Sequence, residues 1–195
     1  MAKKDLILIG GGGHAKVVID ALKGHSKLSI LGILDNNIPT GSIILDIKVI
    51  GNDSMLEDLY KKGTKKAFIS IGSIGCVAVR KKIYKKLKVI GYELPPIIHP
   101  KAYVADGVSI EEGSFIGAGA IINPGTKIRR NAIINTGASV DHDCNIGNFV
   151  HIAPGSVLGG DVTVSDNVHI GMGAIIVQGV TIKEQAFIKA RELVK

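Results

Sequence analysis

The segment 116-IGAGAIINPGTKIRRNAIINTGASVDHDCNI-146 carries an aliphatic residue at every sixth position, beginning with Ile116. The same spacing runs from Ile98 to Val194 over 17 consecutive positions without an insertion. A period of six fits neither the 3.6-residue period of a helix nor the alternation of a strand hairpin. It predicts a hexapeptide-repeat solenoid, a parallel β-helix in which each hexad forms one short strand and one corner. The series comprises Ile98, Val104, Ile110, Ile116, Ile122, Ile128, Ile134, Val140, Ile146, Ile152, Leu158, Val164, Ile170, Ile176, Ile182, Ile188 and Val194.

Mostly small residues occur four positions after these aliphatic ones, including Ala120, Thr126 and Cys144. In a stacked coil the aliphatic side chains fill the central axis, and only small residues fit beside them near the corners. Neighbouring coils also satisfy each other's backbone groups, so the stability of such a stack accumulates along its length.

The N-terminal half has a different pattern, in which apolar runs alternate with amphipathic segments. We expect strands over 5–9, 28–34 and 67–71 and helices over 15–22, 54–62 and 77–87. This βαβαβα order predicts a small Rossmann-like α/β module with about three parallel strands. The chain is therefore expected to contain two domains, a Rossmann-like module over 1–97 and a solenoid over 98–195.

A run of four glycines, 10-GGGG-13, lies between the first predicted strand and the first predicted helix. The free N–H groups and positive dipole at such a helix start favour phosphate. Asp35 follows the next strand, where an acidic residue can hold a ribose or base. The glycines do not form a convincing dinucleotide fingerprint. A mononucleotide-type ligand is therefore favoured over NAD, and a purely structural glycine turn stays open.

Composition excludes several classes of protein. No apolar run approaches the roughly 20 residues that span a bilayer, and the N-terminal residues 1–5 lack the features of a signal peptide. The two cysteines, Cys76 and Cys144, are far apart, which predicts reduced thiols and a cytoplasmic location. The chain has a net charge of +7, and its basic half is residues 1–97, with 16 Lys or Arg against 8 Asp or Glu. The lysines over 81–88 fit the solvated face of a helix. No known nucleic-acid-binding motif accompanies them, so nucleic-acid binding is not expected.

Four motifs precede the solenoid: 13-GHAKVV-18, 34-LDN-36, 71-IGS-73 and 80-RKKIY-84. In this order the chain resembles the hexapeptide-repeat sugar acetyltransferases of the sialic-acid O-acetyltransferase type. It equally resembles the UDP-4-amino-sugar N-acetyltransferases of bacillosamine-type pathways. The resemblance covers nearly the whole chain and implies a left-handed β-helix, acetyl-CoA as co-substrate, and a homotrimer with active sites between subunits.

The resemblance also implies where a sugar or UDP-sugar binds. Its diphosphate would lie near the glycine-rich turn, its nucleoside near the end of the second strand, and its sugar in a cleft that follows the third strand. The implied substrate-binding residues are Gly11, Gly13, His14, Ala15, Lys16, Asp35, Asn36, Gly72 and Ser73.

The catalytic segment of the resembled family matches residues 135–144. His142 falls outside the core frame, since Val140 and Cys144 point inward, and an imidazole there suits proton transfer. The resemblance implies that His142 is a general base oriented by Asp143. The family often has Glu at this position, so Asp141 is an alternative partner.

The same resemblance implies that His151 contacts the thioester region of acetyl-CoA and that the N–H of Gly160 steadies the thioester oxygen. His169 is 18 residues from His151, so the two stack on one face; we include His169 as a cofactor-binding candidate beside the simpler alternative of a stacked surface residue. No metal is expected, because no carboxylate or cysteine joins these histidines at ligand spacing.

The sequence thus predicts acetyl transfer from acetyl-CoA to an amino or hydroxyl group of a sugar, by direct attack on the thioester. Transfer to another small acceptor and a non-catalytic nucleotide-sugar-binding scaffold are the alternatives. The final residues, 192-ELVK-195, break the small-residue pattern at Glu192, which leaves open whether the CoA site is complete. The sequence does not decide which sugar is used, or between N- and O-acetylation.

Overall fold

The computed structural model describes residues 4–23 and 28–195. Residues 1–3, part of the N-terminal stretch considered above, and His25 lie outside the described residues. The chain divides into two compact units, Met1–Gly72 with Ala78–Pro95, and Ser73–Val77 with Pro96–Lys195. The second unit therefore begins two residues before the expected boundary and also takes in a five-residue segment from the N-terminal half.

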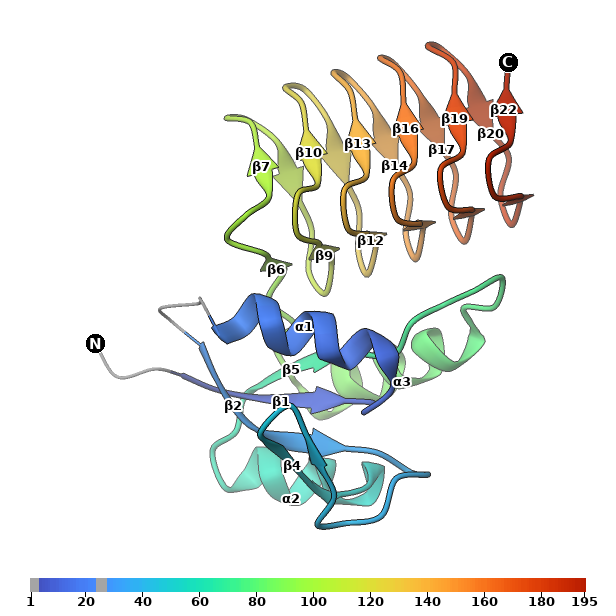
Figure 1. Ribbon diagram of the computed structural model, residues 1–195. Helices are drawn as coiled ribbons and strands as arrows, with labels where there is room; N and C mark the ends of the chain where they lie inside the picture. The colour runs from blue at the N-terminus through green and yellow to red at the C-terminus, as the bar shows by residue number, and fades with distance from the viewer. Residues whose placement is uncertain (1–3, 24–27) are drawn as a thin grey trace. The chain divides into compact units, whose positions relative to one another are not determined.

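The first unit is built on a five-stranded sheet in the order β3-β4-β2-β1-β5 (Figure 1). The parallel strands are β1 (Lys4–Ile9), β2 (Leu28–Leu34), β4 (Ile47–Gly51) and β5 (Lys66–Ile69), and β3 (Ile43–Ile44) is antiparallel to β4. The expectation of about three strands was therefore wrong. The missed hairpin turns at Leu45 and Asp46, both of which have positive φ. Neither residue belongs to the Asn-Gly or Asp-Gly pairs that announce such a turn in a sequence.

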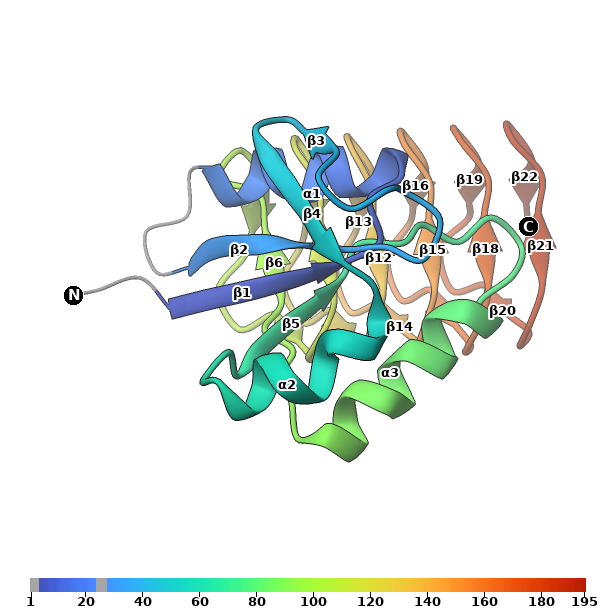
Figure 2. The same ribbon diagram turned by 90° about the horizontal axis from the view of Figure 1, so that it is seen from below.

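Helices cover both faces of this sheet, as the unbroken burial of residues 6–9 along β1 requires. Ile7 and Ile9 pack in one cluster with Leu56, Ile83 and Leu87. They therefore face α2 (Leu56–Lys61), which follows the short helix η1 (Asp53–Met55), and α3 (Ala78–Ile90). The opposite face is covered by α1 (Gly13–Lys23) (Figure 2). All four parallel strands end at one edge, so the residues that follow them are brought together there.

The second unit is a left-handed parallel β-helix, as predicted. Residues 18 apart pair in register, for example Ile133 with His151 and His151 with His169, so three hexads make one coil. The strands form three sheets that run along the stack of coils (Figure 1).

Each sheet contains every third strand of the solenoid. The first sheet contains β7 (Tyr103–Val104), β10 (Ile121–Ile122), β13 (Ser139–Val140), β16 (Val157–Leu158), β19 (Ile175–Ile176) and β22 (Leu193–Val194). The second contains β8 (Ser109–Ile110), β11 (Lys127–Ile128), β14 (Asn145–Ile146), β17 (Thr163–Val164) and β20 (Thr181–Ile182). The third contains β6 (Ile97–Ile98), β9 (Phe115–Ile116), β12 (Ile133–Ile134), β15 (His151–Ile152), β18 (His169–Ile170) and β21 (Phe187–Ile188).

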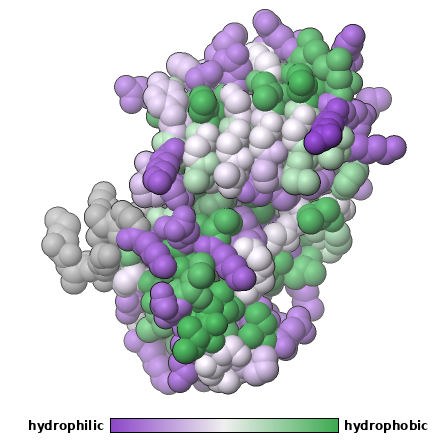
Figure 3. Space-filling model, in the orientation of Figure 1, coloured by the Kyte–Doolittle hydropathy of each residue, from purple (hydrophilic) through white to green (hydrophobic). Residues whose placement is uncertain are grey.

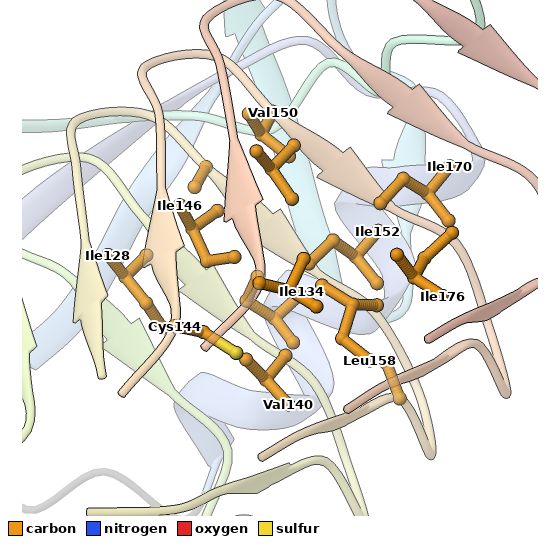
Figure 4. Packing of buried hydrophobic residues seen from close by; sticks show 14 of the residues in the cluster. Ile128, Ile134, Val140, Cys144, Ile146, Val150, Ile152, Leu158, Ile170 and Ile176 are labelled. Atoms are coloured by element: carbon orange, nitrogen blue, oxygen red, sulfur yellow. The ribbon is translucent and has the colours of Figure 1, made fainter. Parts of the chain in front are cut away.

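Twelve of the 17 aliphatic residues of the repeat lie in one buried core cluster inside the coils (Figure 4). The other five, which lie toward the two ends of the stack, are partly buried and pack against it: Ile98, Val104, Ile110, Ile188 and Val194. The small polar residues beside them bond to backbone carbonyls inside the stack. Ser114 Oγ donates to the carbonyl of Arg129, and Thr126 Oγ1 donates to that of Asp141, both at 2.8 Å. Polar atoms are thereby tolerated in an otherwise apolar interior. Glu192, which broke the pattern, folds its carboxylate back onto the N–H of Lys189 at 2.7 Å, and the coil continues into β22.

Every corner from residue 107 onward is turned by one residue with left-handed backbone, again spaced by six. These residues are Gly107, Gly113, Gly119, Gly125, Asn131, Gly137, Asp143, Phe149, Gly155, Asp161, Asn167, Gly173, Gly179, Gln185 and Arg191. Glycine, Asn and Asp dominate because they reach this conformation at the lowest cost. Asp143, the expected partner of His142, occupies one of these positions.

We expect the substitution Gly179→Ala to destabilise the protein by about 1–2 kcal/mol, because a Cβ is costly in left-handed backbone. Gly179 has φ 76°, and an added Cβ would meet no other atom, so the loss would report the backbone alone. Chemical denaturation measures it, with the adjacent exposed Gln178→Ala as control. Equal stability of the two variants would contradict the argument.

Candidate active site

His142 and Asp143 occupy the corner between β13 and β14, and their side chains are in contact. The imidazole Nδ1 lies 2.8 Å from Asp143 Oδ2, with both side chains more than half exposed. Asp143 Oδ2 is an acceptor when ionised, so in the neutral imidazole Nδ1 carries the shared proton and the lone pair is on Nε2. This is the protonation state that a general base needs.

Glycines in the neighbouring coils make room for this pair. The Asp143 carboxylate occupies the space that a Cβ on Gly125 would fill, one coil earlier. On the other side, a Cβ on Gly160 would lie 2.5 Å from His142 Nε2. Gly160 does not have a positive φ, so its backbone does not require glycine; the imidazole beside it does. This packing does not involve the N–H of Gly160, which is still expected to donate to a thioester oxygen.

Asp141, the alternative partner of the imidazole, is occupied elsewhere. Its Oδ1 accepts from Asn123 Nδ2 and from the backbone N–H of His142, both at 2.8 Å. These two bonds, with that from Asn123 the stronger, lower the pKa of Asp141. Asp141 therefore fixes the backbone of the corner, and Asp143 contacts the ring.

The hydrogen bond to Asp143 raises the pKa of His142, and the nearby charges of Asp141, Asp143 and Asp161 act in the same direction. The imidazole is therefore a stronger base than an isolated histidine.

Cys144, the other reactive group in this segment, points into the core as predicted. It is fully buried, its thiol donates to the carbonyl of Gly159 at 3.2 Å, and burial raises its pKa. A buried thiol with a raised pKa is a poor nucleophile, so the corner offers a base and not a covalent catalyst.

His151 and His169 stack as predicted, on the outer side of the third sheet. Their rings meet edge to face with centroids 5.0 Å apart, and Phe187 stacks on His169 at 4.8 Å. Both ring nitrogens of His151 are engaged, Nδ1 with the carbonyl of Ser73 and Nε2 with Asn135 Nδ2 at 3.2 Å. A bond from Nε2 to a thioester would therefore have to replace the bond to Asn135. His169 is buried, and its burial lowers its pKa.

These rings explain why the segment Ser73–Val77 belongs to the second unit. Ser73 bonds to His151, and Gly75 lies against the ring of Phe187. The three rings border a cavity of about 280 Å³ whose walls also include Ile74, Met172 and Ala190. The walls are mainly apolar, which suits an extended aliphatic chain more than a charged group.

His142 and His151 are not brought together within one chain. His142 lies at the corner between the first and second sheets, whereas His151 lies on a strand of the third sheet. In a three-sided prism, the corner with His142 lies opposite the face with His151.

In the first unit, Asp35 ties the glycine-rich turn to the end of β2. Its Oδ2 accepts from the N–H of Gly11 at 2.7 Å, and its Oδ1 accepts from the N–H groups of Asn37 and Ile38. Burial of the carboxyl acts to raise its pKa, but these three bonds outweigh it and lower the pKa of Asp35. With both oxygens used, Asp35 shapes the turn instead of presenting a free carboxylate.

The other residues of the turn differ in what they can offer a phosphate. Ala15 is buried and its N–H donates to the carbonyl of Gly12. Gly13, at the start of α1, has open space above its Cα, and Lys16 is exposed one turn later. Gly72 lies against the Cβ of His14, so the segment after β5 meets this turn.

Asn36 pairs with a residue that the sequence analysis did not select. Its Nδ2 donates to Asp53 Oδ2 at 3.1 Å, and its Oδ1 accepts from the N–H of Asp53 at 3.2 Å. Lys82 and Lys86 of α3, read above as solvated lysines, border the same cavity as Asn36 and Asp53. Their i, i+4 spacing on one helix face was the available signal.

Within residues 4–23 and 28–195, no three His, Cys, Asp or Glu side chains are grouped to hold a metal ion. Nor does any helix in these ranges have the length and hydrophobicity to cross a membrane.

Comparisons with known proteins show the family to which the chain belongs. Residues 5–87 match the family model of the PglD N-terminal domain, and residues 93–192 match that of the GMPPB C-terminal domain. The chain is 37% identical to PerB from Caulobacter crescentus, solved in complex with CoA and GDP-perosamine. That match covers 100% of this chain and 90% of PerB, with a TM-score of 0.91. The chain belongs to the hexapeptide-repeat sugar acetyltransferases.

A second relative in this family is the acetyltransferase domain of PglB from Neisseria gonorrhoeae. It is 30% identical over 99% of this chain and 92% of that domain, with a TM-score of 0.89. The same domain has also been solved with acetyl coenzyme A. WeeI from Acinetobacter baumannii, 21% identical with a TM-score of 0.65, shares the fold. The chain is thus an acetyl-CoA-dependent sugar acetyltransferase, as predicted from the sequence.

We expect Asp143→Asn to lower the pKa of His142, because the amide removes the charge that favours the imidazolium. A titration of the His142 ring followed by NMR measures the pKa in both proteins. The control is Asp106→Asn, an exposed carboxylate two coils earlier. An unchanged or higher pKa in Asp143→Asn would show that the contact does not set the basicity of His142.

Proposed function

We propose that this acetyltransferase acetylates the amino group of a nucleotide-linked amino sugar, with His142 as general base and Asp143 as its positioning residue. The contact between His142 Nδ1 and Asp143 is the observation that carries the proposal, because it leaves Nε2 as a free proton acceptor. N-acetylation is favoured over O-acetylation because the relative PerB was solved with GDP-perosamine, and other structures of that enzyme name it a perosamine N-acetyltransferase.

In the proposed reaction the amine nitrogen attacks the thioester carbonyl carbon, and His142 Nε2 takes the proton that this nitrogen loses. The N–H of Gly160 is the proposed donor to the oxygen on which negative charge develops. The C–S bond then breaks, and the thiolate of CoA leaves and receives the proton from His142. The chain supplies no covalent intermediate in this sequence, which agrees with the burial of Cys144.

For acetyl-CoA, we propose that the cavity beside Ile74, Met172 and Ala190 holds the aliphatic arm, with His151 and His169 along its side. For the nucleotide sugar, we propose that Gly13, His14 and Lys16 meet the diphosphate. Gly11, Ala15 and Asp35 shape that turn from behind, and Asn36, Gly72 and Ser73 belong to the segments that border the sugar and nucleoside. We therefore propose 1–97 as the nucleotide-sugar module and 98–195 as the catalytic domain, with Ile74 as a residue of 1–97 that also lines the cavity of the second unit.

We further propose that the active enzyme is a homotrimer. The outer positions of the first sheet carry exposed Tyr103, Ile121, Val157, Ile175 and Leu193, whereas those of the second sheet are Ser109, Lys127, Asn145, Thr163 and Thr181. Hydrophobic side chains are correspondingly visible on the solenoid surface in Figure 3. Such an apolar stripe favours contact with another copy. A neighbouring copy would also bring its third sheet, with His151, close to the corner with His142. These two histidines are kept apart within one chain.

We expect His142→Ala to lower turnover by about 10²–10⁴-fold, the usual contribution of a general base. The assay follows release of the CoA thiol with acetyl-CoA and a panel of nucleotide-linked amino sugars and sialic acids. Size-exclusion chromatography with light scattering verifies that the oligomer persists. Near-wild-type turnover in this variant would refute the assigned base. Absence of thiol release by the wild-type chain with every acceptor would favour a non-catalytic binding protein.

We expect Ile175→Asp to dissociate the proposed trimer, because it introduces a charge into the apolar stripe of the first sheet. Thr163→Asp adds the same charge to the polar second sheet and should leave the oligomer unchanged. Light scattering measures the mass of both variants. An oligomer that survives Ile175→Asp but not Thr163→Asp would assign the interface to the other face.

A further inference from the structure

A cavity of about 340 Å³ lies in the first unit, at the edge where its parallel strands end. Gly10 and Asp35, which follow β1 and β2, border this cavity. Asp53, the first residue of η1, also borders it. Lys82 and Lys86 border it from α3. The proposed catalytic corner belongs to the other unit.

Asp53 is held in place by three contacts within the first unit. Asn36 bonds both to its carboxylate Oδ2 and to its N–H, at 3.1 and 3.2 Å. Lys86 Nζ donates to its backbone carbonyl at 2.7 Å. These contacts leave Asp53 Oδ1 without a hydrogen-bond donor in the part of the chain that the structure describes, while two further protons of the Lys86 ammonium are available. The cavity therefore presents a carboxylate with an ammonium group beside it.

This pair of charges matches one nucleobase better than the others. Guanine presents the acceptor O6 and two adjacent donors, N1–H and the 2-amino group, along one edge. Uracil presents one N–H between two carbonyl oxygens, either of which would be repelled by a carboxylate. Adenine and cytosine each present a single amino group beside a ring nitrogen that accepts.

We propose that this cavity selects guanine, so that the donor sugar is carried by GDP. The Asp53 carboxylate accepts from N1–H and the 2-amino group, and the Lys86 ammonium donates to O6. This rests on the proposed function only in that the first unit holds the nucleotide. Asp53 is then the residue that determines which nucleotide sugar enters, since a site with a fixed charged acceptor rejects an analogue that leaves it unpaired.

The test is calorimetric binding of GDP, UDP and ADP to the full chain without acetyl-CoA, so catalysis does not enter the readout. We expect the wild type to bind GDP at least about tenfold more tightly than UDP, which corresponds to one good base contact. In Asp53→Asn the bond to Asn36 is retained, but an amide N–H opposes guanine N1–H and suits a uracil carbonyl. The preference for GDP should therefore collapse or invert.

Asp58→Asn, which removes the same charge from an exposed position of α2, should leave the preference unchanged. Lys86→Met should weaken GDP binding more than UDP binding; an equal loss for both would assign Lys86 to phosphate and overturn its part. Melting curves verify folding, and Asp53→Ser replaces the amide variant if that one unfolds. Wild-type binding of UDP as tight as GDP would overturn the guanine proposal alone. Failure of every nucleoside diphosphate to bind would overturn the proposed nucleotide-sugar function.

Discussion

The solenoid depends on one backbone constraint, the left-handed conformation that recurs at each corner. Each corner turns the chain so that the aliphatic residue of the next hexad points back to the axis. The N–H of the corner residue then bonds one coil down; Asp143 donates to the carbonyl of Pro124 and Asp161 to that of His142. The proposed catalytic pair is a product of this constraint, because Asp143 is itself a corner residue. The backbone conformation that turns the coil also directs its carboxylate at His142.

A second dependence joins the proposed catalytic corner to its neighbours in the stack. The imidazole needs the absence of a side chain at Gly160, and the carboxylate needs the same at Gly125. The proposed catalytic corner therefore involves three successive coils, although both of its side chains, His142 and Asp143, come from one hexad. In the first unit, Asp35 has a comparable double role, since it closes the glycine-rich turn and ends β2 at once.

The sequence predicted the solenoid almost completely, because a period of six is visible at every core position and was interrupted by no insertion. It also predicted that His142 lies outside the core and that Cys144 points inward, since both positions follow from the register. What it missed depends on local backbone and on contacts between distant segments. The hairpin at Leu45 and Asp46 uses residues that give no turn signal, and the pairing of Asn36 with Asp53 joins positions 17 residues apart. A second period of six, mostly of Gly, Asn and Asp from Gly107 onward, was also present in the sequence. Its residues have the left-handed backbone that turns each corner.

The pairing of residues 18 apart has a consequence for how such chains can change in length. A gain or loss of one whole coil leaves every remaining side chain on its original edge, with its core and corner positions intact. A change of any other size rotates all later residues around the axis and moves His142 away from the corner between the first and second sheets. Natural length variation in this solenoid should therefore come in steps of one coil, or be confined to loops that leave the coil and return to the same corner.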